Sequence, residues 1–210
     1  KRQAQAILKE GGYAQTGSHS SLDGAVHKRI RGVTGQVLNL REFVKLDGHI
    51  RRLVNEAIDR VEGKDAVDLL REVNYELPAQ VVFKVLGIPD SDIPSVKHWA
   101  GARSVIDFSP ATHAELEGAR NMVAFWQYCT EMVREREKHP QDDFTSRMLE
   151  IRNGDDAVMT IPEIITHTFG VAFAGHETTT NQLTNTFRSL LENREPVSYT
   201  HLRAHETSLH

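Results

Sequence analysis

The sequence has one cysteine, Cys129, among its 210 residues, and no methionine at its start. A single cysteine excludes an internal disulfide and is typical of a protein from a reducing cytoplasm. No apolar run approaches the roughly 20 residues that are needed to span a bilayer. The first residues are basic, but no apolar segment follows them, so they do not form a secretory signal. We therefore expect a soluble, cytoplasmic protein whose true N-terminus precedes Lys1.

Neither sign of charge is in large excess. The chain has 25 Lys and Arg against 29 Asp and Glu, which gives a net charge of -4 and a pI near 6.3. This balance gives no electrostatic reason to expect nucleic acid or an anionic membrane as a partner. Low-complexity tracts, fixed-period repeats and internal linkers are also missing, and the length suits one large domain or two small ones.

Apolar residues recur at spacings of three and four along most of the chain, and strand-like alternation is almost absent. Residues 43–61 place one apolar stripe opposite charged residues, as an amphipathic helix does. Similar patterns run over 67–89, where Gly87 marks the end of a helix, and over 114–140. A shorter helix is predicted before a turn at Asn153–Gly154. The sequence therefore predicts a mainly α protein with short connections.

The longest predicted helix begins at Thr160 and continues to about Asn193. Thr160 and Glu163 form a capping-box pattern, in which each side chain can bond the backbone of the other. Pro162 lies in the first turn, where its missing N–H costs nothing. More than thirty residues at 1.5 Å each give roughly 50 Å, so this helix must cross a whole domain.

The middle of this helix contains small and polar residues that are weak helix formers. Gly175 has no side chain, so a flat ligand could approach the backbone there. The Thr178 hydroxyl can bond the Ala174 carbonyl and open the helix locally, while Glu177 supplies a carboxylate for proton relay. The alternative is a helix crossing, in which small residues only permit close packing and Glu177 faces solvent. Spacing by itself favours this alternative.

The segment Ala174–Thr179, AGHETT, resembles the oxygen-binding motif of the central helix in cytochrome P450, the heme-thiolate monooxygenase superfamily. Residues 139–173 are similar to the segment that leads into that helix, and 76–92 to the helix that ends in Leu-Gly-(Val/Ile)-Pro. Residues 22–31 resemble the heme-propionate helix. The resemblance implies a partial cytochrome P450 domain over residues 1–195, an incomplete version of that fold with its oxygen-binding helix at about 160–193.

The resemblance assigns His27 and Arg31 to the family's His-x-x-x-Arg pattern, which binds the heme propionates. Their i,i+4 spacing puts both on one helix face, where charge-assisted hydrogen bonds to a propionate pair are possible. The alternative is an exposed basic helix edge, since Lys28 and Arg29 are charged as well. Residues 24–26 depart from the family's Pro-Pro-Glu at this point.

The same resemblance gives roles to the central motif. Ala174 and Gly175 would lie over the porphyrin on the oxygen side. Thr178 would hydrogen-bond dioxygen, and Glu177 would help to deliver protons for cleavage of the O–O bond. His176 matches a variable position, so we expect a satisfied or partly exposed histidine without a catalytic role.

The family's iron ligand is a cysteine in a Phe-x-x-Gly-x-x-x-Cys loop, which follows the central helix and a Glu-x-x-Arg helix. Neither motif occurs in this chain, so no axial cysteine is assigned. Cys129 lies before the central helix in an amphipathic pattern, and we expect it to be a small buried apolar residue. The resemblance therefore covers the N-terminal and middle parts of the enzyme, and we expect this chain to be inactive alone.

The last residues, 196–210, lose the helical period and are rich in histidine. From Val197 on they resemble the translation of a transposase-based sequencing adapter, so we expect a non-native tail. A metal site at His201 and His205 is the alternative, and it is disfavoured. The chain has no His-Glu-x-x-His pattern, because the positions that would need histidine hold Thr180 and Leu209.

The resemblance implies a heme b-dependent monooxygenase that inserts one atom of dioxygen into an apolar small molecule. Electrons would come from NAD(P)H through a ferredoxin and its reductase, or through a flavin reductase. The alternative from another class is a non-catalytic, all-α ligand-binding or scaffolding domain, in which the small residues serve helix crossings.

Overall fold

The computed structural model describes residues 2–18, 21–101 and 112–193, and these residues contain helices but no strand. The first half holds α1 (Arg2–Glu10), α2 (Gly24–Val37), α3 (Leu40–Val44), α4 (Asp47–Val61) and a π-helical turn, η1 (Leu70–Asn74). The second half holds α5 (Leu77–Leu86), α6 (Ile93–Ala100), α8 (Thr112–Lys138), α9 (Phe144–Arg152) and α10 (Ile161–Glu192). The predicted mainly α class is confirmed for the described residues.

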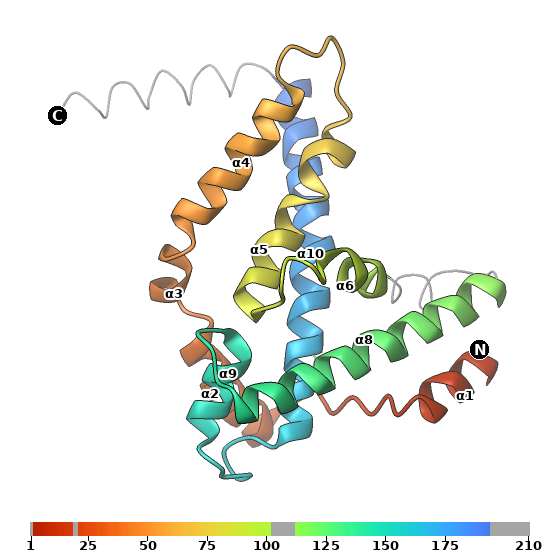
Figure 1. Ribbon diagram of the computed structural model, residues 1–210, viewed down its shortest axis with the longest axis vertical. Helices are drawn as coiled ribbons and strands as arrows, with labels where there is room; N and C mark the ends of the chain where they lie inside the picture. Colours follow the sequence, from red (N-terminus) through yellow and green to blue (C-terminus); the bar gives the residue numbers. More distant parts are fainter. Residues whose placement is uncertain (1, 19–20, 102–111, 194–210) are drawn as a thin grey trace.

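Helix α10 is the axis of the molecule (Figure 1). Helix α5 packs along it, α8 crosses it, and α1 lies against α8. Aromatic rings fill the crossing: the ring centroids of Phe125 and Phe169 lie 4.8 Å apart, and those of Trp126 and Phe169 lie 5.5 Å apart. All three side chains are buried, so this cluster joins the N-terminal half of α10 to α8.

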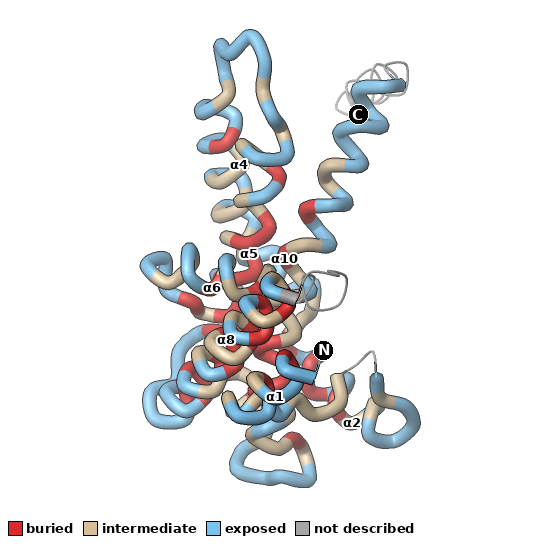
Figure 2. Tube along the Cα trace, turned by 90° about the vertical axis from the view of Figure 1, so that its right-hand side faces the viewer, coloured by how far each residue is buried: buried red, intermediate tan, exposed pale blue. Residues whose placement is uncertain are grey.

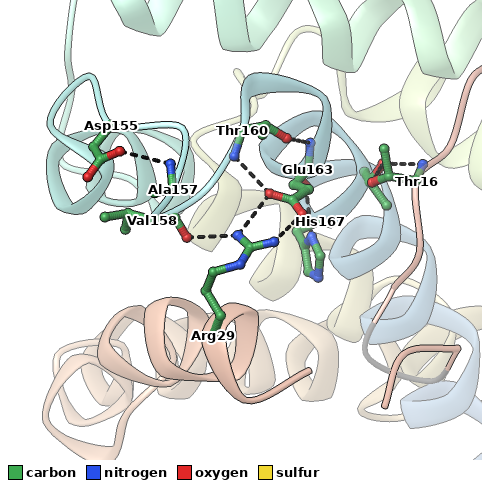
Figure 3. Close-up of polar contacts among 9 residues, drawn as sticks. Thr16, Arg29, Asp155, Ala157, Val158, Thr160, Glu163 and His167 are labelled. Carbon is green, nitrogen blue, oxygen red and sulfur yellow. Dashed lines mark hydrogen bonds and ion pairs between the residues drawn. The ribbon is translucent and has the colours of Figure 1, made fainter. Parts of the chain in front are cut away.

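The start of α10 has the predicted capping box (Figure 3). The Glu163 N–H donates to Thr160 Oγ1 at 3.3 Å, and the Thr160 N–H donates to Glu163 Oε2 at 2.8 Å. The helix then continues without a break to Glu192, as the sequence predicts. Two backbone donors that a helix start leaves unsatisfied are thus paired by side chains.

Other predicted boundaries are confirmed as well. Gly87 ends α5 in the left-handed region with φ of 76°, and α9 ends at a left-handed turn formed by Asn153 and Gly154, with φ of 47° and 77°. The pattern over 114–140 forms α8.

The single helix predicted over 43–61 is wrong, because the chain forms α3 and α4 there. The Lys45 N–H donates to Glu42 O, and the Leu46 N–H donates to Phe43 O, so the bonds span three residues rather than four. This tighter turn separates the two helices.

Two parts of the chain extend away from the buried body, as Figure 2 shows: the α4 arm and the C-terminal part of α10. On α4 only Ala57 is buried, and most residues of α10 after Thr180 are exposed. None of the described helices has both the length and the apolar character needed to cross a bilayer.

Candidate functional site

The residues of the central motif, 174–178, occupy little more than one turn of α10, and they differ in how far they are buried. Successive residues on an α-helix point about 100° apart. Ala174 and Thr178 are exposed on the same face, whereas His176 on the opposite face is buried. Gly175 and Glu177 are half-buried on the two flanks. The rotation of α10 about its own axis therefore decides what each motif residue can contact.

Gly170, Ala174 and Thr178 form a narrow stripe, called here the open face of α10. Thr178 Oγ1 donates to the Ala174 carbonyl at 2.6 Å, which confirms the predicted side-chain bond within the helix. A carbon added at Gly170 would meet no atom of the described chain within 4 Å. The open face thus offers a hydroxyl and a polarised carbonyl on a surface with no bulky side chain.

Gly175 serves a helix crossing. A side-chain carbon added there would come within 2.7 Å of Val82 Cγ2 on α5, closer than packed carbons approach. The missing side chain therefore faces α5 rather than the open face, which is the close helix packing that the alternative reading expects. The predicted contact of Gly175 with heme stays a prediction.

The Glu177 side chain lies beside the end of α6. Its Oε1 would be 3.9 Å from a carbon added to Gly101, the residue that caps α6. Glu177 is half-buried, so its side chain is neither fully enclosed nor fully exposed to solvent. The carboxylate therefore lies at the flank of the open face, about 100° around the helix from Thr178.

His176 is buried, so of the two predicted alternatives the partly exposed histidine is wrong, and the satisfied one holds for one of its two ring nitrogens. Its ring lies between Tyr75 and Phe83, with centroid distances of 5.2 and 6.3 Å. Its Nε2 bonds the Tyr75 carbonyl at 3.3 Å, whereas its Nδ1 is buried without a partner among the described residues. His176 and Gly175 together hold α10 against η1 and α5.

Burial lowers the pKa of His176, and the positive charge of Lys97 lowers it further. The hydrogen bond to the Tyr75 carbonyl, Glu177 and Glu76 act in the opposite direction, but burial is the largest cause. Because the folded pKa is the lower one, the unfolded chain binds the proton first as the pH falls below about 6.5. The stability that neutral His176 contributes is therefore lost from that pH downward.

His176→Gln is expected to make the unfolding free energy less dependent on pH below about 6.5, because the group that takes up the proton on unfolding is gone. Urea unfolding at a series of pH values measures this. His167, also buried with a pKa lowered by burial, remains in the variant, so the pH dependence is reduced rather than abolished. His139→Gln, just after the end of α8, is the control because this side chain is 72% exposed, and equal slopes for both variants would contradict the assignment.

His27 and Arg31 lie on α2. Arg31 is exposed and His27 is half-buried, so neither belongs to the apolar side by which α2 packs. Between them in the sequence, Arg29 reaches Glu163 at the start of α10 (Figure 3). Glu163 precedes Gly175 by twelve positions, or about 18 Å of helix rise. The predicted site residues thus form two groups, one on α10 and one on α2, and the two helices are joined through Arg29.

Arg29 is the residue that sequence reasoning missed. In the sequence it is one more charge on a basic helix edge. Its partner Glu163 lies 134 residues away, and Glu163 already had a local explanation in the capping box. The sequence does contain one signal for a separate role. Arg29 is two positions from both His27 and Arg31, so it lies on another side of the helix from that pair.

Known proteins resemble this chain both in sequence and in the arrangement of the helices. The sequence profile of the family described as Cytochrome P450 matches residues 103–198. The biotin biosynthesis cytochrome P450 of Bacillus subtilis is 29% identical over 172 residues, which cover 81% of this chain and 43% of that protein. The structure of cytochrome P450 CREJ in complex with (4-ethylphenyl) dihydrogen phosphate has a TM-score of 0.84 at 27% identity, and covers 92% of this chain and 48% of that one. The chain is therefore similar in sequence and in fold to cytochrome P450 enzymes.

A second curated cytochrome P450, 107B1 of Saccharopolyspora erythraea, is 29% identical over 94% of this chain and 47% of its own length. P450BioI, solved in complex with an acyl carrier protein ligated to hexadec-9Z-enoic acid, has a TM-score of 0.78 at 25% identity over 94% of this chain. The chain spans about half the length of the relatives it matches. The predicted fold, an incomplete cytochrome P450 fold built on a long central helix, is confirmed.

The residues on α10 and α2 fit the heme that cytochrome P450 enzymes use. On α10 the open face has no side chain larger than that of threonine, as a planar macrocycle lying against the helix would require. On α2 the imidazole and the guanidinium of the His27–Arg31 pair project from one face, and both can donate hydrogen bonds to carboxylates.

Cys129 is buried in α8, as predicted for a small apolar residue. Burial raises the pKa of its thiol, so it remains protonated, whereas a metal ligand must be a thiolate. The predicted adapter-derived tail, 196–210, and the disfavoured metal pair His201 and His205 lie outside the described residues.

Proposed function

We propose that this chain is part of a heme-dependent monooxygenase that inserts one oxygen atom into an apolar small molecule. The observation that carries this proposal is the Thr178 hydroxyl bonded to the Ala174 carbonyl on an otherwise open face of α10. That polar group lies on a helix of the cytochrome P450 fold, within the segment that matches the family. Dioxygen and the substrate would meet at this face.

The heme b would be held by two groups of residues. Gly170, Ala174 and Thr178 would face the porphyrin, with Gly175 at the edge of the contact. His27 and Arg31 would bind the propionates. Hydrogen bonds between charged partners are roughly twice as strong as neutral ones, so these two residues would supply the polar part of heme affinity.

Bound heme supplies the reductive activation of dioxygen. The Thr178 hydroxyl has one hydrogen and two lone pairs, and its hydrogen is already directed at the Ala174 carbonyl. It can therefore accept a hydrogen bond from a water, or turn and donate one to the oxygen side of the site. Glu177 would hold the proton that this hydroxyl passes on, since the two residues are adjacent and Glu177 flanks the open face.

Electrons would come from NAD(P)H through a ferredoxin and ferredoxin reductase, or through a flavin reductase. The family resemblance supports this class of partner. Neither nucleic acid nor a membrane is proposed as a partner, because the overall charge gives no reason for either.

A second candidate function is a non-catalytic all-α binding or scaffolding domain. The contact of Gly175 with Val82 favours it, because this glycine has a packing role that needs no ligand. Packing does not account for the open face, however, where Gly170 meets no described atom within 4 Å. The two candidates therefore differ in whether heme binds.

The product of the complete open reading frame, reduced and exposed to carbon monoxide, is expected to show the thiolate-shifted Soret band. The 210-residue chain alone, whose only cysteine is a buried thiol, is expected to lack this band. A complete protein that takes up no heme would refute the monooxygenase proposal and leave the scaffold.

The heme-binding residues are tested in the same protein by titrating the apoprotein with hemin. Arg31→Ala is expected to weaken heme affinity by about tenfold to 100-fold, as the loss of a hydrogen bond to a charged group does. Lys28→Ala, an exposed cation three positions earlier on α2, is the matched control and should change the affinity less than about twofold. Equal losses for the two variants would assign the effect to overall charge.

A further inference from the structure

Arg29 joins α2 to the start of α10 through three hydrogen bonds (Figure 3). Its Nη2 donates to Glu163 Oε1 at 2.6 Å, and its Nη1 donates to Glu163 Oε2 at 3.1 Å. Nη1 also donates to the Val158 carbonyl at 2.9 Å, in the turn before α10. The guanidinium and the carboxylate therefore meet as a fork, which restricts their relative orientation as well as their distance.

Glu163 is held from both sides. While Arg29 binds both of its oxygens, Oε2 also accepts the Thr160 N–H of the capping box. The hydrogen bonds from Arg29 are the largest cause that holds the pKa of Glu163 at about 2. The pair is therefore fully charged at neutral pH, and the Glu163 side chain is only 13% exposed.

The position of Arg29 on α2 relates this ion pair to the proposed heme residues. At about 100° per residue, Arg29 lies on one side of the buried stripe of α2, and His27 and Arg31 lie together on the other side. That stripe consists of Ile30, Val33, Thr34 and Val37. Any rotation of α2 about its axis that moves Arg29 away from Glu163 must move His27 and Arg31 by the same angle.

Apolar packing by itself sets this angle weakly, because the hydrophobic effect is not directional. The bidentate pair is directional. Arg29 on α2 makes this bidentate contact with Glu163 on α10, the helix that carries the central motif. The relative orientation of the two proposed heme-binding groups therefore depends on it.

We infer that the Arg29–Glu163 ion pair is a positioning clamp for heme: it sets the rotation of α2 so that His27 and Arg31 reach the propionates of a heme that lies against the open face of α10. The inference rests on the proposed function. Arg29 and Glu163 are positioning residues, since they act through His27 and Arg31 and are occupied by each other.

The test uses the product of the complete open reading frame, stripped of heme and titrated with hemin. Arg29→Met and Glu163→Gln are each expected to weaken heme affinity about tenfold, the range seen when a residue that orients a ligating group is lost. The double variant is expected to be no weaker than either single variant, because both remove the same interaction. Arg29→Lys keeps the charge but not the fork, and is expected to behave like Arg29→Met.

Two features separate positioning from general loss of stability. Gln at position 163 can still form the capping box, so Glu163→Gln should keep the start of α10 while losing the clamp. The Soret circular dichroism of the loaded variants should change, since it reports how the heme sits relative to the helices. Arg152→Met is the matched control: it breaks the ion pair with Asp156 from an arginine side chain that is 15% exposed, and should leave both readouts unchanged.

The outcomes are distinct. Wild-type protein that takes up no hemin would refute the proposed function, and the clamp with it. Wild-type protein that binds hemin, with Arg29→Met and Glu163→Gln equal to it in affinity and Soret circular dichroism, would refute the clamp alone.

Discussion

Thr178→Ala in the product of the complete reading frame is expected to lower product formation by about 100-fold while electron uptake continues. This is the size of effect expected when a group that positions or transfers a proton in the transition state is removed. The variant loses the hydroxyl that bonds the Ala174 carbonyl at 2.6 Å. Oxygen that is reduced without a correctly placed proton donor is expected to leave the site as peroxide.

The measurement compares NAD(P)H oxidised, peroxide released and product formed, with an apolar substrate chosen by its shift of the Soret band. Thr178→Ser keeps the hydroxyl and is expected to retain most of the product. Thr179→Ala is the matched control, because Thr179 is exposed and belongs to the same run of threonines. A Thr178→Ala enzyme that couples electrons to product as well as wild type does would remove Thr178 from the mechanism.

Asp143→Ala is expected to lower the unfolding free energy of the chain by about 3–5 kcal/mol, the cost of leaving one partner of a buried ion pair alone. Arg136 Nε donates to Asp143 Oδ2 at 2.6 Å, and the two side chains are 7% and 2% exposed. Asp143 also accepts the Ser146 N–H at 2.8 Å and so caps α9. Arg136 in turn donates to the Gly87 carbonyl at 3.0 Å, so the pair connects the ends of α5, α8 and α9.

Urea unfolding measures this effect. Asp142→Ala is the control, since its side chain is 84% exposed and pairs with Arg147 at 3.1 Å. A surface pair of this kind contributes about 1 kcal/mol or less. A loss at Asp143 no greater than that at Asp142 would show that the buried pair does not hold the three helix ends together.

The parts of this fold that could be predicted depend on short-range chemistry. Three predicted features involve only residues within four positions of one another. They are the capping box at Thr160 and Glu163, the left-handed end of α5 at Gly87, and the bond from Thr178 to the Ala174 carbonyl. Each follows from a local hydrogen bond or from the allowed values of φ, so the sequence around it contains the necessary information. The break between α3 and α4 is the exception, because an apolar period does not show where three-residue bonds replace four-residue bonds.

The sequence predicts which residues form the site, but it does not predict how the helices orient them. The resemblance to cytochrome P450 enzymes named Ala174, Gly175, Glu177 and Thr178, yet it could not show that the missing side chain of Gly175 faces Val82. Nor could it show that His176 is buried against the Tyr75 carbonyl, about a hundred residues earlier in the chain. These contacts set the rotation of α10, and so decide that Thr178 rather than His176 lies on the open face.

The sequence by itself thus determined the helical class, the extent of α10, the motif in its middle and the resemblance to cytochrome P450 enzymes. The tertiary structure decided the rotation of α10 and α2, and the pairing of Arg29 with Glu163. The physical reason is the range of the interactions. Helix ends and side-chain bonds to the backbone involve neighbours in the chain, whereas the facing of a helix depends on side chains brought to it from distant segments.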